Sequence, residues 1–426
     1  MKAMKQSGIQ WIGDIPVNWC IKKIKYLAND EANSFIDGDW IESENISSEG
    51  IMYLTTGNIG DGVFKIQGDG FITEETFKGL KCKYAYPGDL VFSRLNAPYG
   101  RSCILGDIRT EYVLAVDNVI LRTNHDKRYI CYVSQCDGYQ HSVEDDASGT
   151  TMKRISRTKL GNIYIPLPPV EEQIKISNYL DKKCNLIDKT LFDLSNQIEL
   201  LQQYKKSVIS EAVFGGLDSN IKTKESGAEW IKSIPEHWGI GRIASVYSVR
   251  NTKVNDRDYP PLSVTMQGIV PQLETAAKTD AHDDRKLVCK GDFAINSRSD
   301  RRGSCGISPC DGSISLINTV LCPLRNMNPG YYNWLFHTIE FADEFYKCGH
   351  GIVDDLWTTG WQEMKNILIP LPPLKEQELI SKHLEDKCSK IDSVLSQKQL
   401  QYETLLDFKK SLIYEFVTGK KEIPNE

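Results

Sequence analysis

The sequence predicts an α+β fold: two mixed α/β domains at opposite ends of a long antiparallel two-helix coiled coil, related by a pseudo-twofold axis. Three observations lead to this prediction. The chain repeats itself, each half contains a long heptad pattern, and each half contains short β-branched runs separated by glycine and aspartate turns. The predicted segments are a first domain over 1–165, a first helical block over 166–216, a linker and second domain over 217–369, a second helical block over 370–420, and a tail over 421–426.

The repeat consists of two blocks in each half. The upstream block reads SGIQWIGDIPVNWCIKKI at 7–24 and SGAEWIKSIPEHWGIGRI at 226–243. The downstream block opens with IPLPPVEEQIKI at 165–176 and IPLPPLKEQELI at 369–380, and its later pieces keep the same offset of 204 residues. Repetition at a fixed offset over this length indicates that one structural unit is written twice.

Between the blocks lie two variable regions, about 25–160 and 244–365, which agree only in fragments. Each contains alternating or β-branched runs, such as AYPGDLVFS and SISLINTVLC, between glycine and aspartate turns. Such runs are typical of strands in mixed α/β domains. The frame is therefore duplicated while its contents have diverged.

The downstream blocks predict two helices of about 45 residues, roughly 65 Å long. Proline suits the first turn of a helix, and glutamates follow the prolines where the helix dipole favours negative charge. Glycines at 215–216 and 419 end the helices. Lysines at 205, 398 and 409 interrupt the apolar seam. The seam residues are Leu180, Cys184, Ile187, Leu191, Leu194, Ile198, Leu201 and Val208 in the first helix, and Leu384, Cys388, Ile391, Leu395, Tyr402, Leu405, Leu412 and Phe416 in the second.

A helix this long with one apolar stripe needs a partner, and the other copy is available. Because the first helix delivers the chain to the second domain, the second helix can bury its seam by running back along the first. We therefore expect an antiparallel pair. The alternative is that each helix packs on its own domain.

Composition is that of a soluble globular protein: 426 residues, 40% hydrophobic, 25% charged, with a formal net charge of −6. This charge argues against indiscriminate coating of nucleic acid. No apolar run approaches the length of a membrane span, and the N-terminus lacks an apolar signal core. The twelve cysteines form no Cys-x-x-Cys pair and have no zinc-like histidine spacing beside them, so we expect free thiols in a reducing cytoplasm.

The sequence contains no phosphate-binding loop of the Gly-x-x-x-x-Gly-Lys-Ser/Thr type, no Gly-x-Ser-x-Gly elbow and no His-Glu-x-x-His zinc helix. The segment Asn96-Ala97-Pro98-Tyr99 is similar to the Asn-Pro-Pro-Tyr motif of adenine methyltransferases. It lacks the first proline, however, and no glycine-rich cofactor motif precedes it. We therefore predict no catalytic site.

Basic and polar residues gather in four loops, two in each variable region. Arginine and asparagine pair with guanine and adenine edges, whereas lysine and threonine commonly hold phosphate. The alternative is that these are solvated surface loops, with arginines ion-paired to neighbours such as Asp300. The candidate DNA-binding residues are Arg94, Asn96, Tyr99, Arg101, Thr150, Thr151, Lys153, Arg154, Asn296, Arg298, Arg301, Arg302 and His350.

The chain resembles the specificity subunits of type I restriction–modification enzymes over nearly its whole length. The resemblance depends on the W-I-x-x-I-P-x-x-W motif (Trp11 to Trp19 and Trp230 to Trp238), the I-P-L-P-P-x-x-E-Q helix starts, and the duplication. It implies that each variable region is a target recognition domain that reads one part of a split, asymmetric DNA site. It also implies that the helical blocks form a spacer.

The same resemblance implies a non-catalytic DNA-recognition subunit that binds no cofactor itself. Two modification subunits would bring S-adenosylmethionine, and restriction subunits would use ATP and Mg. One feature departs from a strongly basic DNA binder: region 22–160 has 17 Lys and Arg against 20 Asp and Glu. Two other interpretations remain open, an enzyme with an unrecognised site and a scaffold whose paired domains bind proteins.

Overall fold

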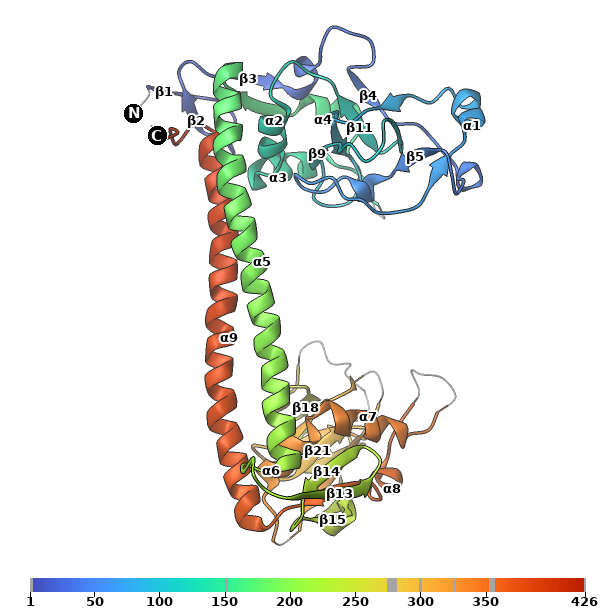
Figure 1. Ribbon diagram of the computed structural model, residues 1–426, viewed down its shortest axis with the longest axis vertical. Coiled ribbons are helices and arrows are strands. Elements are labelled where there is room, and N and C mark those ends of the chain that lie inside the picture. Colours follow the sequence, from blue (N-terminus) through green and yellow to red (C-terminus); the bar gives the residue numbers. More distant parts are fainter. Residues whose placement is uncertain are drawn as a thin grey trace. The chain divides into compact units, whose positions relative to one another are not determined.

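The computed structural model describes residues 3–149, 152–273, 282–298, 301–324, 326–351 and 357–424. The chain divides into two compact units, which can be followed by colour along the sequence in Figure 1. The first unit comprises Met1–Ser195 and Leu400–Glu426, and the second comprises Asn196–Gln399. The boundaries fall inside the two predicted helical blocks, so each unit contains one variable region and a part of both helices.

The first variable region forms two four-stranded sheets. One has the strand order β6-β5-β10-β7 and includes the parallel pair β5 and β10, while the other is antiparallel with the order β4-β11-β8-β9. The central strands read IMYL, LVFS, YVL and NVIL, and these are the buried ones, as expected for apolar and β-branched runs. The strands of the first unit are β1 (Met4–Gln6), β2 (Asp14–Pro16), β3 (Cys20–Lys23), β4 (Phe35–Asp37), β5 (Ile51–Leu54), β6 (Phe71–Ile72), β7 (Tyr84–Ala85), β8 (Leu90–Ser93), β9 (Ser102–Ile104), β10 (Tyr112–Leu114), β11 (Asn118–Leu121) and β12 (Tyr164–Leu167).

Helices α2 (Lys127–Ser134), α3 (Asp137–Asp146) and α4 (Arg157–Asn162) pack with the second of these sheets, whereas α1 (Glu74–Gly79) packs with the first. Helices α1, α2 and α4 each begin after a residue whose side chain accepts a backbone hydrogen bond from the first turn: Thr73, Asp126 and Ser156. Buried residues of α2 and α3 share one apolar cluster with strands β8 and β11. The short helices of this unit are α1 (Glu74–Gly79), α2 (Lys127–Ser134), α3 (Asp137–Asp146) and α4 (Arg157–Asn162), with 3-10 turns at Ile24–Leu27, Ser43–Asn45 and Thr56–Asn58.

The second unit repeats the helix-covered sheet and changes the rest. Its sheet β16-β24-β21-β22 corresponds strand by strand to β4-β11-β8-β9, and β17-β20-β23 and β18-β19 are smaller antiparallel sheets. The mixed α/β prediction is confirmed for both variable regions. The elements are β13 (Thr223–Ala228), β14 (Ile231–Pro235), β15 (Gly239–Arg242), β16 (Tyr247–Arg250), β17 (Lys253–Val254), β18 (Leu262–Thr265), β19 (Gly268–Pro271), β20 (Arg285–Val288), β21 (Phe293–Asn296), β22 (Cys305–Ile307), β23 (Gly312–Ser315), β24 (Asn318–Pro323), β25 (Leu368–Leu371), α6 (Pro329–Phe336), α7 (Ile339–Lys347) and α8 (Trp361–Met364), with a 3-10 turn at Ile243–Ser245.

The two long helices are α5 (Val170–Gly215) and α9 (Leu374–Val417). The IPL part of each repeated stretch is a strand, β12 or β25, and the helix begins directly after the second proline. The carbonyl of Pro169 accepts the first two helical hydrogen bonds of α5, and Pro373 does the same for α9. Gly216 and Gly419 follow the helices with φ of 78° and 71°, a conformation that glycine adopts without strain.

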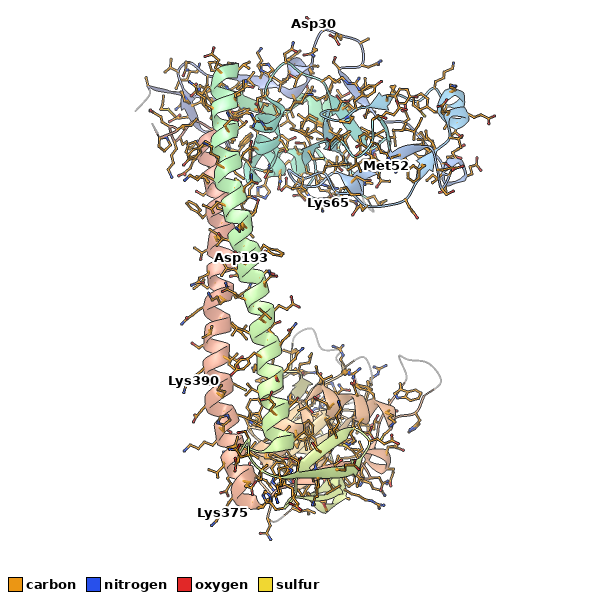
Figure 2. All side chains as sticks on the ribbon, viewed as in Figure 1. Asp30, Met52, Lys65, Asp193, Lys375 and Lys390 are labelled. Carbon is orange, nitrogen blue, oxygen red and sulfur yellow. The ribbon has the colours of Figure 1, made fainter. Side chains whose placement is uncertain are left out.

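The seam prediction is confirmed, because every predicted seam position is buried or half-buried. In the first unit, the start of α5 packs antiparallel against the end of α9, and the ring centroids of Tyr179 and Phe416 lie 4.6 Å apart. In the second unit, the end of α5 packs antiparallel against the start of α9. Charged side chains such as Asp193 on α5 and Lys390 on α9 are exposed (Figure 2).

Two of the interrupting lysines have partners across the seam. Lys409 Nζ lies 2.6 Å from Asp188 Oδ1, and Lys205 Nζ lies 2.6 Å from Asp392 Oδ1. Each pair occurs within one unit. Residues 188 and 392 are equivalent in the repeat, as are residues 205 and 409. The duplicated sequence therefore makes the same ion pair twice, with the roles of the helices exchanged.

All twelve cysteines are free thiols, as predicted. No helix in the described ranges is long and apolar enough to cross a membrane. Over that same part of the chain, no three histidine, cysteine, aspartate or glutamate side chains are grouped as they would be to hold a metal ion.

Candidate nucleic-acid interface

The repeated motifs make the same contacts in both units. The indole Nε1 of Trp19 donates to Glu172 Oε2 at 3.1 Å, and that of Trp238 donates to Glu376 Oε2 at 2.9 Å. The tryptophan ends the W-I-x-x-I-P-x-x-W motif of the upstream block, and the glutamate belongs to the helix start of the downstream block. Strand pairs β3–β12 and β15–β25 join the same two blocks through the backbone. The separated blocks of each half therefore fold together as one platform.

The glutamine after each glutamate connects this platform to the first short helix that follows the sheet strands in each variable region. Gln173 donates to the carbonyl of Pro168 and accepts from the backbone N–H of Asp126, the N-cap of α2. Gln377 donates to Pro372 and accepts from the N–H of Asn328, the N-cap of α6. Both glutamines are buried. Each bond fixes the variable region to its own long helix.

A tyrosine then connects each region to the end of the other long helix. The Tyr129 hydroxyl donates to the carbonyl of Val417 at 2.8 Å, and the Tyr331 hydroxyl donates to that of Val213 at 2.7 Å. Burial raises the pKa of both phenols well above the usual value, so they remain protonated donors. Val213 and Val417 are equivalent in the repeat. The roles of these tyrosines and glutamines were not predicted, although the identity of the Glu-Gln pair in both copies was the available signal.

On this platform, two candidate loops of the first unit lie side by side. The backbone of Arg154 exchanges hydrogen bonds with Ser148 in both directions, and the N–H of Ile155 donates to the carbonyl of Arg94 at 3.1 Å. Leu95 and Arg154 form an isolated β-bridge. The loops 93–101 and 148–154, far apart in sequence, therefore form one surface.

The second unit joins its two loops in the same way. The backbone of Thr358 exchanges hydrogen bonds with His350 in both directions, and the N–H of Thr359 donates to the carbonyl of Ser297 at 3.0 Å. Arg298 and Thr358 form the matching β-bridge. We call this arrangement the paired-loop surface; it consists of the described parts of 93–101 with 148–154 in the first unit, and of 296–304 with 349–359 in the second.

Two of the predicted contact residues lie inside the protein. The Arg94 side chain is 5% exposed, with its guanidinium near Asp37 and Asp117 and bonded to the carbonyls of Val116 and Ile155. Arg101 is also buried; its guanidinium donates to five backbone carbonyls, including Ile59 at 2.6 Å and Thr56 at 2.8 Å. Burial lowers the pKa of both guanidinium groups.

These two arginines stabilise the loops from inside the protein by binding carbonyls and carboxylates. We therefore revise the expectation that they contact DNA. A buried guanidinium whose donors face carbonyls and carboxylates inside the protein is not accessible to a DNA base. Sequence could not separate them from exposed arginines, because the residue type is the same.

Other candidates of the first unit are accessible. Asn96 is exposed with φ of 63°, Tyr99 is half-buried, and Lys153 is exposed with Nζ 4.0 Å from Glu144. The Arg154 side chain is 47% exposed, and Nη1 lies 3.5 Å from Asp117 Oδ1. Thr150 and Thr151 lie outside the described residues.

In the second unit, Asn296 caps its own loop, because its Oδ1 accepts from the N–H of Arg298. The Arg298 carbonyl accepts from the Tyr346 hydroxyl. Arg301 and Arg302 are exposed; Arg302 pairs with Asp343 and lies 5.2 Å from the ring centroid of Tyr346.

His350 is also exposed, with Nδ1 3.8 Å from Glu363. Asp300, suggested above as an arginine partner, lies outside the described residues.

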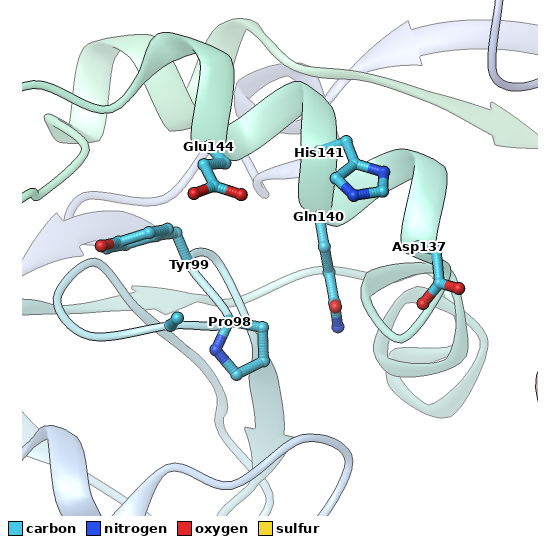
Figure 3. Close-up of a pocket in the computed structure, with 7 residues that line it drawn as sticks. Pro98, Tyr99, Asp137, Gln140, His141 and Glu144 are labelled. Carbon is cyan, nitrogen blue, oxygen red and sulfur yellow. The ribbon is translucent and has the colours of Figure 1, made fainter. Parts of the chain in front are cut away.

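A pocket of about 390 Å³ borders the first paired-loop surface between the loop at 97–99 and helix α3 (Figure 3). Figure 3 shows Pro98 and Tyr99 facing Asp137, Gln140, His141 and Glu144 on that helix. Carboxylates on this side repel phosphate.

A second pocket, of about 340 Å³, opens at the paired-loop surface of the second unit. Among the described residues its lining contains no carboxylate, and it includes one lysine and one tryptophan. The lining residues are Val249, Asn251, Lys286, Ser297, Leu316, Ile317, Thr319, His350, Thr358, Gly360 and Trp361. The two units therefore offer different chemistry on the same backbone arrangement.

Comparison with known proteins gives the family. The model of the type I restriction modification DNA specificity domain matches residues 16–200. A candidate type I restriction enzyme specificity subunit, MjaX, from Methanocaldococcus jannaschii is 25% identical over 96% of this chain and 95% of its own length. The type I restriction enzyme MjaVIII specificity subunit of the same organism is 30% identical over 66% of this chain and 68% of its own length.

The fold has a solved counterpart. A chain from a structural study of complex assembly and conformational transition of the type I restriction–modification system aligns with a TM-score of 0.73. It is 14% identical, and the alignment covers 96% of this chain and 99% of that one. Sequence family, repeated frame and fold agree. The chain belongs to the family of type I restriction enzyme specificity subunits.

Proposed function

We propose that this chain is the non-catalytic specificity subunit of a type I restriction–modification complex and that it recognises a bipartite, asymmetric DNA site. Each paired-loop surface reads one half of the site. Helices α5 and α9 form an antiparallel spacer with a recognition domain at each end, related by a pseudo-twofold axis. The spacer fixes the number of base pairs between the half-sites.

The observation that carries the proposal is the pairing of a constant frame with variable loops. The Trp–Glu, Gln–backbone and Tyr–carbonyl bonds recur at equivalent positions in both units. On this frame, loop residues at matched positions differ: Thr358 stands where the first unit has Arg154, and Ser297 stands where it has Arg94. A frame that is kept while its loops diverge is suited to presenting two different reading surfaces in the same manner.

The proposal assigns the chemistry to partner subunits. Two modification subunits dock on the helical blocks and bring S-adenosylmethionine, and restriction subunits that use ATP and Mg join outside them; this chain binds no cofactor itself. The exposed charged faces of α5 and α9 are available for such docking. Because the first variable region is not basic, the partners contribute to holding DNA. The complex acts in the cytoplasm.

The test is the methylation pattern of a host that carries this chain with its modification partners. Sequencing of methylated bases should give a motif of two specified parts separated by a gap of fixed length. A continuous motif, or methylation that does not depend on this chain, contradicts the proposal. Methyl transfer by the purified chain alone would instead favour an enzyme, and duplex binding by the partner-loaded complex, lost on mutation of 296–303, would exclude a pure protein-binding scaffold.

A further inference from the structure

The backbone places Arg154 of the first unit and Thr358 of the second at one equivalent position. The two residues lie 204 positions apart, the offset of the repeat. Arg154 forms two backbone hydrogen bonds with Ser148, and Thr358 forms two with His350. Each also forms a β-bridge to the other loop of its unit. The following residue, Ile155 or Thr359, donates to the residue after strand β8 or β21.

In the first unit, the surroundings prepare Arg154 to present its guanidinium. Nη1 lies 3.5 Å from Asp117 Oδ1, and Asp117 lies 3.7 Å from the buried Arg94, which is also held by Asp37. A carboxylate on one side reduces the rotational freedom of the guanidinium while leaving other N–H groups exposed. An arginine held in this way can donate two hydrogen bonds to O6 and N7 of guanine.

In the second unit, the described residues at the positions of Arg94 and Asp117 carry no charge. Ser297 takes the position of Arg94, since each follows the last residue of its strand and accepts from the matching N–H group. Ile317 takes the position of Asp117, each preceding the first asparagine of strand β24 or β11. Thr358 stands at the edge of the 340 Å³ pocket that these replacements leave. A threonine offers one hydroxyl and one methyl group, which suit a single hydrogen bond or contact with a thymine methyl group.

We propose that positions 154 and 358 are the paired specificity-determining positions of the two domains, with Arg154 reading a guanine and Thr358 reading its base pair by a hydroxyl or methyl contact. This inference deepens the proposed function and rests on it. It names one base pair in each half-site and one residue that reads it.

The test compares the methylated motif of complexes that carry the wild-type chain, Arg154→Thr, Arg154→Lys or Arg109→Thr. Arg109 is an exposed arginine of the same domain outside the paired-loop surface, so its variant is the matched control. In the wild type, the half-site read by the first domain should contain a required guanine. Arg154→Thr should lower the ratio of the methylation rate with guanine at that position to the rate with another nucleotide by about 5- to 100-fold. The preferences at the other positions of the motif should stay unchanged.

Arg154→Lys should behave similarly, because lysine cannot form the two-bond contact. The separate variant Thr358→Val should change the preference at one base pair of the other half-site, which guards against failure of Arg154→Thr to fold. Three results would each overturn the inference: a half-site without guanine, an unchanged preference in both Arg154 variants, or an equal loss on all sequences, the last of which would make Arg154 a phosphate contact. A split motif that stays unchanged in these variants refutes the inference but leaves the proposed function intact.

Discussion

Charge reversal at Asp188 tests whether the ion pairs across the seam align the two helices. In the first unit, Lys409 Nζ lies 2.6 Å from Asp188 Oδ1 and 2.8 Å from Oδ2. The lysine side chain is 21% exposed and the aspartate 51%, so water screens the pair only in part. Loss of such a pair costs about 0.5–1 kcal/mol, and two like charges about 4 Å apart repel by about 1 kcal/mol in high dielectric. We expect Asp188→Lys to lower the free energy of unfolding of the first unit by about 2 kcal/mol.

The measurement is urea unfolding of the purified chain, followed by circular dichroism at low and high salt. The exchange variant Asp188→Lys with Lys409→Asp should recover most of the loss, and high salt should shrink the effect of the single variant. Asp193→Lys, at an exposed position of the same helix, is the control and should change little. The reasoning is refuted if the exchange variant is no more stable than Asp188→Lys alone.

Three further predictions concern the buried Arg94, the Trp19–Glu172 bond of the platform, and the helical spacer. Arg94→Ala should lower stability by about 2 kcal/mol in thermal or urea unfolding, because it removes the buried cation that Asp37 and Asp117 share and leaves each carboxylate with only a more exposed arginine; unchanged stability would contradict the bracing role. Trp19→Phe should cost about 1–2 kcal/mol by removing the donor to Glu172, measured in the same assay, and an unchanged midpoint would count against this bond. Deletion of 191–197 together with 395–401 keeps the heptads in phase and shortens the spacer by roughly 10 Å. The gap in the methylated motif should contract by about three base pairs, or modification should be lost because the half-sites rotate; full modification at the unshortened site would contradict a rigid spacer.

The frame could be predicted from sequence because its signals are periodic or repeated. The heptad spacing predicted which residues form the seam and which lysines interrupt it, because spacing alone decides which residues share a helix face. The Glu-Gln pair after the prolines was visible as a repeat. Its bonds to Trp19 and Asp126 were not, because they join residues about 150 and 47 positions apart whose meeting depends on the folded path.

The site could be predicted only as a pair of loops. The paired-loop surface includes both predicted loops of each unit, but Arg94 and Arg101 lie beneath it. Composition cannot distinguish an arginine that donates to carbonyls from one that faces solvent. Thr358 was overlooked because threonine carries no charge, although its offset of 204 from Arg154 marks it once the repeat is aligned.

The central claim is that two independent readers are held on one duplicated frame. The most direct measurement is the methylated motif after residues 25–160 are replaced by the corresponding region of another specificity subunit, with the modification partners unchanged. We predict that one half of the motif changes while the other half and the gap stay the same. A change in both halves, or in neither, would contradict the account.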